Sequence, residues 1–149
     1  MATRFVMDTD ALSLYVRGDT QAAQVVRRLG IDTFTATVVT ANKIMLGWQN
    51  LLRRAKNAPQ EADAWRRYTN SLNALRIVTW LPLTESAIAR YESLKKARLN
   101  VGMNDLRIAA IALHAGATVV TRNINDFRRV PELSVAPWSN TDAAGQEDF

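Results

Sequence analysis

Hydrophobic positions along the chain fall into short apolar runs separated by longer segments with a helical period. The apolar runs predict buried strands at residues 4–8, 32–39, 76–83, 117–121 and 134–138. Helical spacing predicts helices over residues 11–18, 20–30, 39–55, 60–75, 84–99 and 104–116. The polar segment RNINDFRRVPEL, residues 122–133, predicts a loop. Strands that alternate with helices predict an α/β fold with a mainly parallel central sheet flanked by helices.

Short polar residues and glycines mark the ends of several of these helices. Gly30 and Gly116 follow helical segments, where glycine readily ends a helix. Thr84 is positioned to cap the helix that begins after it. Asn57 and Pro59 interrupt the long helical pattern, so we expect two helices between residues 39 and 75.

Length and charge indicate the size of the domain and a kind of partner. The chain has 149 residues, enough for one domain, which we assign to residues 1–138, followed by a mobile acidic tail at 139–149. The net charge is +5, but residues 1–140 hold all 19 basic residues and only 11 of the 14 acidic ones, a charge of +8. Such an excess suits a polyanionic partner. Solvated helix faces explain basic clusters such as Arg128-Arg129 equally well.

Several classes of protein are disfavoured by what the sequence does not contain. There are no cysteines, so disulfides and thiolate metal sites are excluded. No apolar run is long enough for a signal peptide or a membrane span, and we expect a cytoplasmic protein without membrane association. The glycines form no phosphate-binding loop. His114 is the only histidine, and helix-terminal packing is its expected role.

Acidic and amide side chains follow the predicted strands at positions that bring them to one edge of the sheet. Asp8 ends the first strand, Asp105 lies at the start of helix 104–116, and Asn123 and Asp126 follow strand 117–121. Crowded carboxylates repel one another, and a hard cation that prefers oxygen ligands, such as Mg²⁺ or Mn²⁺, relieves that repulsion. Each acid also has an ordinary explanation, as a strand end, a helix cap or a turn residue, with Asp10 as the cap after the first strand.

Two longer stretches carry a resemblance that adds to this interpretation. The string VMDTDALS resembles the opening of PIN-domain proteins, and MNDLRIAAIALHAGATVVTRNINDFRRVPEL is similar to the second half of VapC toxins. The resemblance covers residues 4–138. It implies an α/β nuclease that cuts RNA with Mg²⁺ or Mn²⁺, as the toxin half of a type II toxin–antitoxin pair. It also implies an antitoxin that inserts a segment into the active-site groove, and a homodimer or a toxin–antitoxin hetero-oligomer.

The resemblance assigns roles to individual residues. Asp8 and Asp105 match metal-binding acids, and either Asn123 or Asp126 completes the set. The side chains that could orient water, phosphate or RNA are weaker candidates: Thr9, Asn104, Thr121 and Arg122.

Lys43 is the departure from the family pattern. The family usually has an acid four residues before the glycine that corresponds to Gly47, and this chain has a lysine there. Two unit charges about 4 Å apart interact by about 4 kcal/mol at a surface-like dielectric, so the change turns attraction for a cation into repulsion. The ammonium could instead bridge Asp8 and Asp105. The sequence therefore predicts an intact fold with a weakened metal site and reduced cleavage.

Two classes of function follow from this departure. The chain is either a toxin ribonuclease weakened at Lys43, or a non-catalytic binding module that holds an antitoxin or nucleic acid. Restored cleavage after Lys43→Glu distinguishes the two. The four tryptophans, at positions 48, 65, 80 and 138, suit core or interface packing better than base stacking. The helices between residues 39 and 75 suit either a partner-binding groove or ordinary packing.

Overall fold

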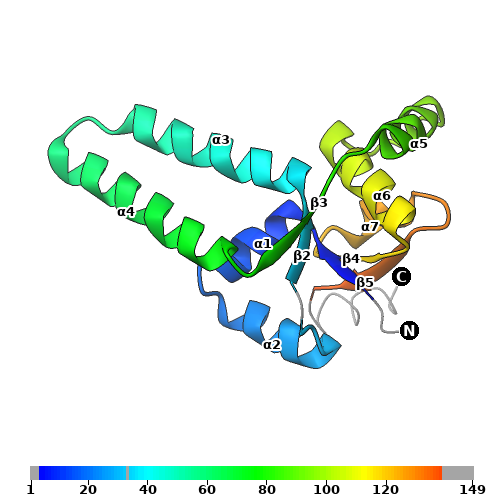
Figure 1. Cartoon of the computed structure of the whole chain (residues 1–149), viewed down its shortest axis with the longest axis horizontal. Coiled ribbons are helices and arrows are strands. Elements are labelled where there is room, and N and C mark those ends of the chain that lie inside the picture. The colour runs from blue at the N-terminus through cyan, green and yellow to red at the C-terminus, as the bar shows by residue number, and fades with distance from the viewer. Residues whose placement is uncertain (1–3, 33, 139–149) are drawn as a thin grey trace.

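A computed structural model describes residues 4–32 and 34–138 of the chain (Figure 1). The strands are β1 (Phe5–Met7), β2 (Phe34–Thr37), β3 (Val78–Leu81), β4 (Thr118–Thr121) and β5 (Ser134–Pro137). The helices are α1 (Thr9–Val16), α2 (Thr20–Leu29), α3 (Val38–Arg54), α4 (Ala58–Leu75), α5 (Glu85–Lys96), α6 (Met103–Ala115) and α7 (Ile124–Arg128). The tail predicted at 139–149 lies outside the described residues.

The predicted strands and helices are confirmed in type and order, with one exception. The segment predicted as a loop at 122–133 contains the short helix α7. Ile124, Phe127 and Val130 are buried there at a spacing of three residues. Burial of these three side chains stabilises a single helical turn whose polar composition alone does not predict one.

All recorded strand pairings are parallel, as predicted. β1 pairs with β4 and β4 with β5, while β2 pairs with β3 in a second ladder. β1 also contacts β2, so the two ladders lie side by side at the centre of the molecule (Figure 1). The carboxyl ends of β1 and β4 therefore meet at the same edge, which is where sites form in sheets of this kind.

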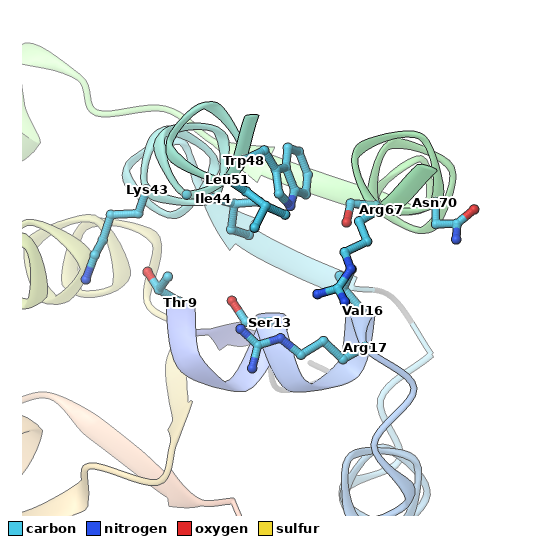
Figure 2. Close-up of a pocket in the computed structure, with 12 residues that line it drawn as sticks. Thr9, Ser13, Val16, Arg17, Lys43, Ile44, Trp48, Leu51, Arg67 and Asn70 are labelled. Carbon is cyan, nitrogen blue, oxygen red and sulfur yellow. The ribbon is translucent and has the colours of Figure 1, made fainter. Parts of the chain in front are cut away.

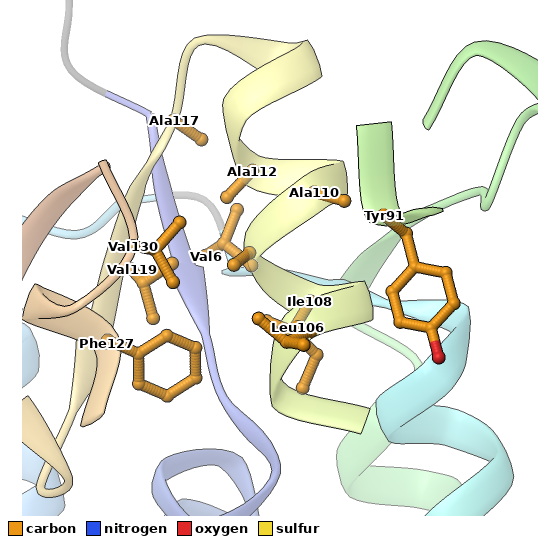
Figure 3. Packing of buried hydrophobic residues seen from close by; sticks show 11 residues of the cluster. Val6, Tyr91, Leu106, Ile108, Ala110, Ala112, Ala117, Val119, Phe127 and Val130 are labelled. Atoms are coloured by element: carbon orange, nitrogen blue, oxygen red, sulfur yellow. The ribbon is translucent and has the colours of Figure 1, made fainter. Parts of the chain in front are cut away.

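The two faces of the sheet are covered by different helices. Val6 and Val119 point into one apolar cluster with α6 and α7, as Figure 3 shows. Met7 and Val120, the next residues along the same strands, point into a second cluster with α1 and α2. This alternation follows from the two-residue period of a strand. Asp8 continues the Val6 side and is thereby directed to the face that α6 covers.

Helix caps and one long hairpin complete the fold. Thr84 accepts a hydrogen bond from the Ala87 amide at 3.2 Å, so its predicted cap is confirmed. Asn57 caps α4 in the same way, which makes the predicted break a helix start. α3 and α4 run out from the sheet and back as a projecting hairpin (Figure 1). None of the described helices combines the length and the apolar character that crossing a membrane requires.

Candidate metal and substrate site

Asp8 is the most buried acid at this edge of the sheet, with 4% of its surface exposed. Its Oδ1 accepts a hydrogen bond from the Ala11 amide at 2.8 Å and caps α1. Its Oδ2 accepts one from the Thr121 hydroxyl at 2.6 Å, across a sequence separation of 113 residues. The capping role expected for Asp10 therefore belongs to Asp8.

Burial dominates the titration of Asp8. Loss of water around the carboxylate raises its pKa to about 6, against the hydrogen bonds from Thr121 and Ala11, which lower it. The negative charges of Asp10 and Asp105 raise it further. Asp8 is therefore electrostatically coupled to Asp105, although the two residues come from different elements.

Asp105 lies in the first turn of α6 and is half-buried. It makes no capping hydrogen bond, because the helix begins after Gly102, so an ordinary capping role does not explain it. Burial raises the pKa of Asp105, the positive charge of Lys43 lowers it, and the negative charge of Asp126 raises it. Lys43 of α3 and Asp126 of α7 thus both act on Asp105 of α6.

Lys43 is an exposed residue of α3 that affects Asp105 through its charge. Within the described parts of the chain, the ion pairs shorter than 4.0 Å do not include Lys43. The bridge between Asp8 and Asp105 that the sequence suggested is therefore not formed. The lysine is close enough to oppose a cation at Asp105 without being held there by hydrogen bonds.

Asn123 and Asp126 are hydrogen-bonded to each other, and Asp126 also pairs with the cationic side chain of Arg129. The Asn123 side-chain amide donates to Asp126 Oδ2 at 2.8 Å, and Arg129 Nη1 donates to Asp126 Oδ1 at 2.9 Å. The Asn123 backbone amide donates to the Thr121 hydroxyl at 2.8 Å. Thr121 therefore connects Asp8 to Asn123, which explains how the ends of β1 and β4 are held together.

The weaker candidates lie around this cluster in different settings. Thr9 shares a hydrogen bond of 3.1 Å with Thr40. Arg122 pairs with Asp10 at 2.8 Å, with both side chains about half exposed. Asn104 accepts a hydrogen bond from Arg107 at 3.2 Å on the surface of α6.

These contacts decide how well the residues suit a divalent cation. Over residues 4–32 and 34–138, no three acidic or histidine side chains are grouped so that they could hold a metal ion. Each acid already accepts hydrogen bonds from other groups of the chain or lies near one of its cationic side chains. The region holds four carboxylates, Asp8, Asp10, Asp105 and Asp126, and three cations, Lys43, Arg122 and Arg129. The residues as they stand do not suit Mg²⁺ or Mn²⁺, which require oxygen ligands free to coordinate.

A groove of about 640 Å³ opens beside the acids, between α1, α3 and α4 (Figure 2). Thr9 and Lys43 line the end nearest the acids, and Trp48 lines its wall. Arg67 extends from α4 toward α1, and Arg17 lies along α1 beside Ser13 (Figure 2). The groove combines apolar and basic side chains, and that it binds a partner stays a prediction.

One prediction about a single side chain needs correction. His114 is exposed in the last turn of α6, so it is not packed, and it lies at the opposite end of the helix from Asp105.

The tryptophans were expected to serve core or interface packing. Trp138 is fully buried in the core, whereas Trp65 is 52% exposed and contacts Tyr68 with ring centroids 6.1 Å apart. Core packing therefore does not account for Trp65, and interface packing stays a prediction for it.

Arg129 is the site residue that the sequence interpretation missed. It was counted only as part of a basic cluster, and its contact with Asp126 depends on α7, which was predicted as a loop. The three-residue spacing of Ile124, Phe127 and Val130 is the signal that would have indicated this helix.

A sequence model of the PIN domain matches residues 5–133, which include every acid described above. This chain belongs to the PIN domain family. Among curated relatives of this PIN protein, Ribonuclease VapC2 of Rickettsia felis is 44% identical over 45 residues, covering 30% of the chain and 34% of the relative. Ribonuclease VapC1 of Haemophilus influenzae is 30% identical over 82 residues, covering 50% of the chain and 61% of the relative. The matches thus span about a third to three fifths of these relatives.

Solved structures show the same fold over most of the PIN chain. A VapBC2 complex from Rickettsia felis bound to a promoter DNA fragment matches with a TM-score of 0.75 and 18% identity, covering 92% of this chain and 100% of that one. A DNA-bound VapBC from Salmonella typhimurium matches with a TM-score of 0.73 and 18% identity, covering 92% and 99%. These likenesses establish the α/β PIN fold that the sequence predicted.

Proposed function

We propose that this PIN protein is the toxin component of a type II toxin–antitoxin pair, built as an endoribonuclease whose metal-dependent cleavage is weakened by Lys43. The single observation that carries the proposal is the match of the PIN domain model to residues 5–133, which hold Asp8 and Asp105. The weakening is inferred from the positive charge of Lys43, which acts on Asp105. The segments similar to ribonucleases named VapC support the reaction class.

The residues at this edge suit the handling of an RNA phosphodiester. Asp8 follows β1 and Asp105 lies in the first turn of α6, and a Glu at position 43 would add a third carboxylate that acts on Asp105. Mg²⁺ or Mn²⁺ bound to such a set would supply Lewis acidity at the phosphate. With Lys43 in place, the ammonium supplies charge at Asp105 and no Lewis acidity, so we expect slow cleavage or none.

The proposed partners follow from the groove and the charge. The excess of basic residues suits RNA, and we propose that Arg122 and Thr9 contact its backbone beside the acids. The solved relatives are toxin–antitoxin complexes, which supports an antitoxin that occupies the groove between α1, α3 and α4, and an assembly of more than one chain. An RNA substrate implies that the protein acts in the cytoplasm.

The alternative is a catalytically inert PIN module that retains its partners. The charge of Lys43 favours this alternative, because it opposes a cation at Asp105 while the hydrogen bond between Asp8 and Thr121 stays in place. In this alternative the chain holds an antitoxin or a nucleic acid and cleaves nothing.

Cleavage of a structured RNA in Mn²⁺ separates the two functions. We would compare the native chain with Lys43→Glu, and with Lys56→Glu as a matched control at the exposed tip of the α3–α4 hairpin. The ribonuclease proposal predicts that only Lys43→Glu gains Mn²⁺-dependent cleavage that EDTA abolishes. Equal cleavage by the native chain and Lys43→Glu would show that Lys43 does not weaken the site. If no variant cuts while RNA or antitoxin still binds, the inert module is the better description.

A further inference from the structure

We propose that Arg129 is a second residue, besides Lys43, that keeps a divalent cation out of this site. The inference rests on the proposed function only for its choice of site, since it concerns metal binding and not cleavage. Arg129 acts through Asp126 and is therefore a positioning residue.

The first step is that both carboxylate oxygens of Asp126 already accept hydrogen bonds from within the chain. Arg129 Nη1 donates to Oδ1 at 2.9 Å, and the Asn123 amide donates to Oδ2 at 2.8 Å. A cation that uses Asp126 must displace a guanidinium that carries charge of the same sign. The exchange loses the exposed contact, which contributes little by itself, and it also brings a divalent cation beside a guanidinium that repels it.

The second step is that Arg129 is itself anchored. The same Nη1 atom donates to the Asn100 carbonyl oxygen at 2.9 Å. Asn100 has a left-handed backbone with φ 59° and lies in the turn before α6, the helix that carries Asp105. Arg129 therefore joins the segment that leads to Asp105 with the helix that carries Asp126.

The third step is the arrangement of charge around the two acids. Asp105 and Asp126 act on each other, with Lys43 on the side of Asp105 and Arg129 on the side of Asp126. Replacing Lys43 alone removes one of these two cations and leaves Asp126 occupied. It follows that Lys43→Glu restores only part of the metal affinity, and that removing Arg129 as well restores more.

Mn²⁺ binding to the full chain, measured as loss of the free-ion signal in electron paramagnetic resonance, tests this inference. We expect no saturable binding by the native chain, weak binding by Lys43→Glu, and binding at least about tenfold tighter by Lys43→Glu with Arg129→Gln, the size of effect typical of residues that orient metal ligands. The matched control is Lys43→Glu with Arg128→Gln, which removes the same charge from the exposed neighbouring residue. The control should bind like Lys43→Glu alone.

Two further variants separate positioning from simple loss of structure. Arg129→Lys in the Lys43→Glu background keeps a cation beside Asp126 and should retain weak binding. Adding Asp126→Asn to the Lys43→Glu, Arg129→Gln chain should abolish the gain. If Arg129→Gln fails to fold, as judged by thermal melting without metal, Arg129→Met carries the same comparison with a side chain of similar length.

The inference is overturned if Arg129→Gln adds nothing to Lys43→Glu, if Arg128→Gln gives the same gain, or if no variant binds Mn²⁺. None of these results depends on RNA. Failure of Lys43→Glu to cleave RNA would therefore leave this inference standing, and failure of Arg129→Gln to improve Mn²⁺ binding would leave the ribonuclease proposal standing.

Discussion

The two halves of the acid site are built in opposite ways. Asp8 is buried, and a backbone amide and the Thr121 hydroxyl hold it within the sheet. Asp126 is one third exposed, and side chains of its own short helix and the preceding turn hold it. Groups of the buried sheet and helix thus fix Asp8, whereas exposed side chains fix Asp126.

This difference indicates which half of the site affects the free energy of folding. A buried carboxylate without a full counter-charge opposes folding, because water stabilises the charged form better than the protein does. An exposed ion pair contributes little to folding, because water screens it. The buried half should therefore dominate stability, whereas changes in the exposed half should mainly affect what binds.

The largest expected effect comes from removing the charge of Asp8. Asp8→Asn keeps a cap for the Ala11 amide, and we expect it to raise the free energy of unfolding at pH 7 by as much as about 3 kcal/mol. The folded-state pKa of about 6 lies above the ordinary 3.8, so folding favours the protonated acid. The native chain therefore loses stability relative to Asp8→Asn as pH rises from about 4 to 6. Urea unfolding of both chains between pH 4 and 8 measures this, and a difference independent of pH would contradict it.

Thr121→Val should lower the free energy of unfolding, by less than Asp8→Asn raises it. This change leaves Asp8 Oδ2 and the Asn123 amide without a partner, at a cost of about 1–3 kcal/mol. It should also raise the pKa of Asp8 further, because the Thr121 hydroxyl lowers it. Urea unfolding at pH 7 gives the stability, with Thr118→Val on the same strand as the control. Equal losses for the two variants would mean that the hydroxyl contact contributes nothing special.

The smallest effect on stability should come from the exposed half. Asp126→Asn and Arg129→Gln each remove the ion pair, and their coupling in a double-mutant cycle should lie below about 1 kcal/mol. A value near zero in 0.5 M salt would agree with a screened surface pair. A coupling free energy of several kcal/mol would mean that the pair of Asp126 and Arg129 contributes to stability as a buried interaction does.

Much of the fold follows from the sequence, because the apolar runs and helical spacing reflect burial directly. Val6 and Val119 lie in runs that have to be covered on both faces, and the parallel sheet follows. The placement of Asp8 and Asp105 at one edge was also predictable, because α6 leads into β4 and so begins at the edge where the parallel strands end.

The orientation of individual side chains was not predictable in the same way. The sequence left open a bridge from Lys43 to two acids, yet among the described residues Lys43 acts on Asp105 through its charge rather than through an ion pair. Arg129 escaped notice because its partners depend on a five-residue helix that forms only where its apolar side chains find a core. Long polar side chains have many conformations, and the sequence does not indicate which one the fold selects.

The parallel pairing of β1 with β4 has a consequence for how the chain matures. Asp8 and Thr121 are separated by 113 residues, so a growing chain leaves the ribosome with β1 unpaired until most of the protein has been made. Contacts that close such a long loop form late in folding. A nascent chain of this topology therefore lacks the carboxyl edge of the sheet until synthesis of the domain is almost complete, so the proposed cleavage of RNA cannot begin before then.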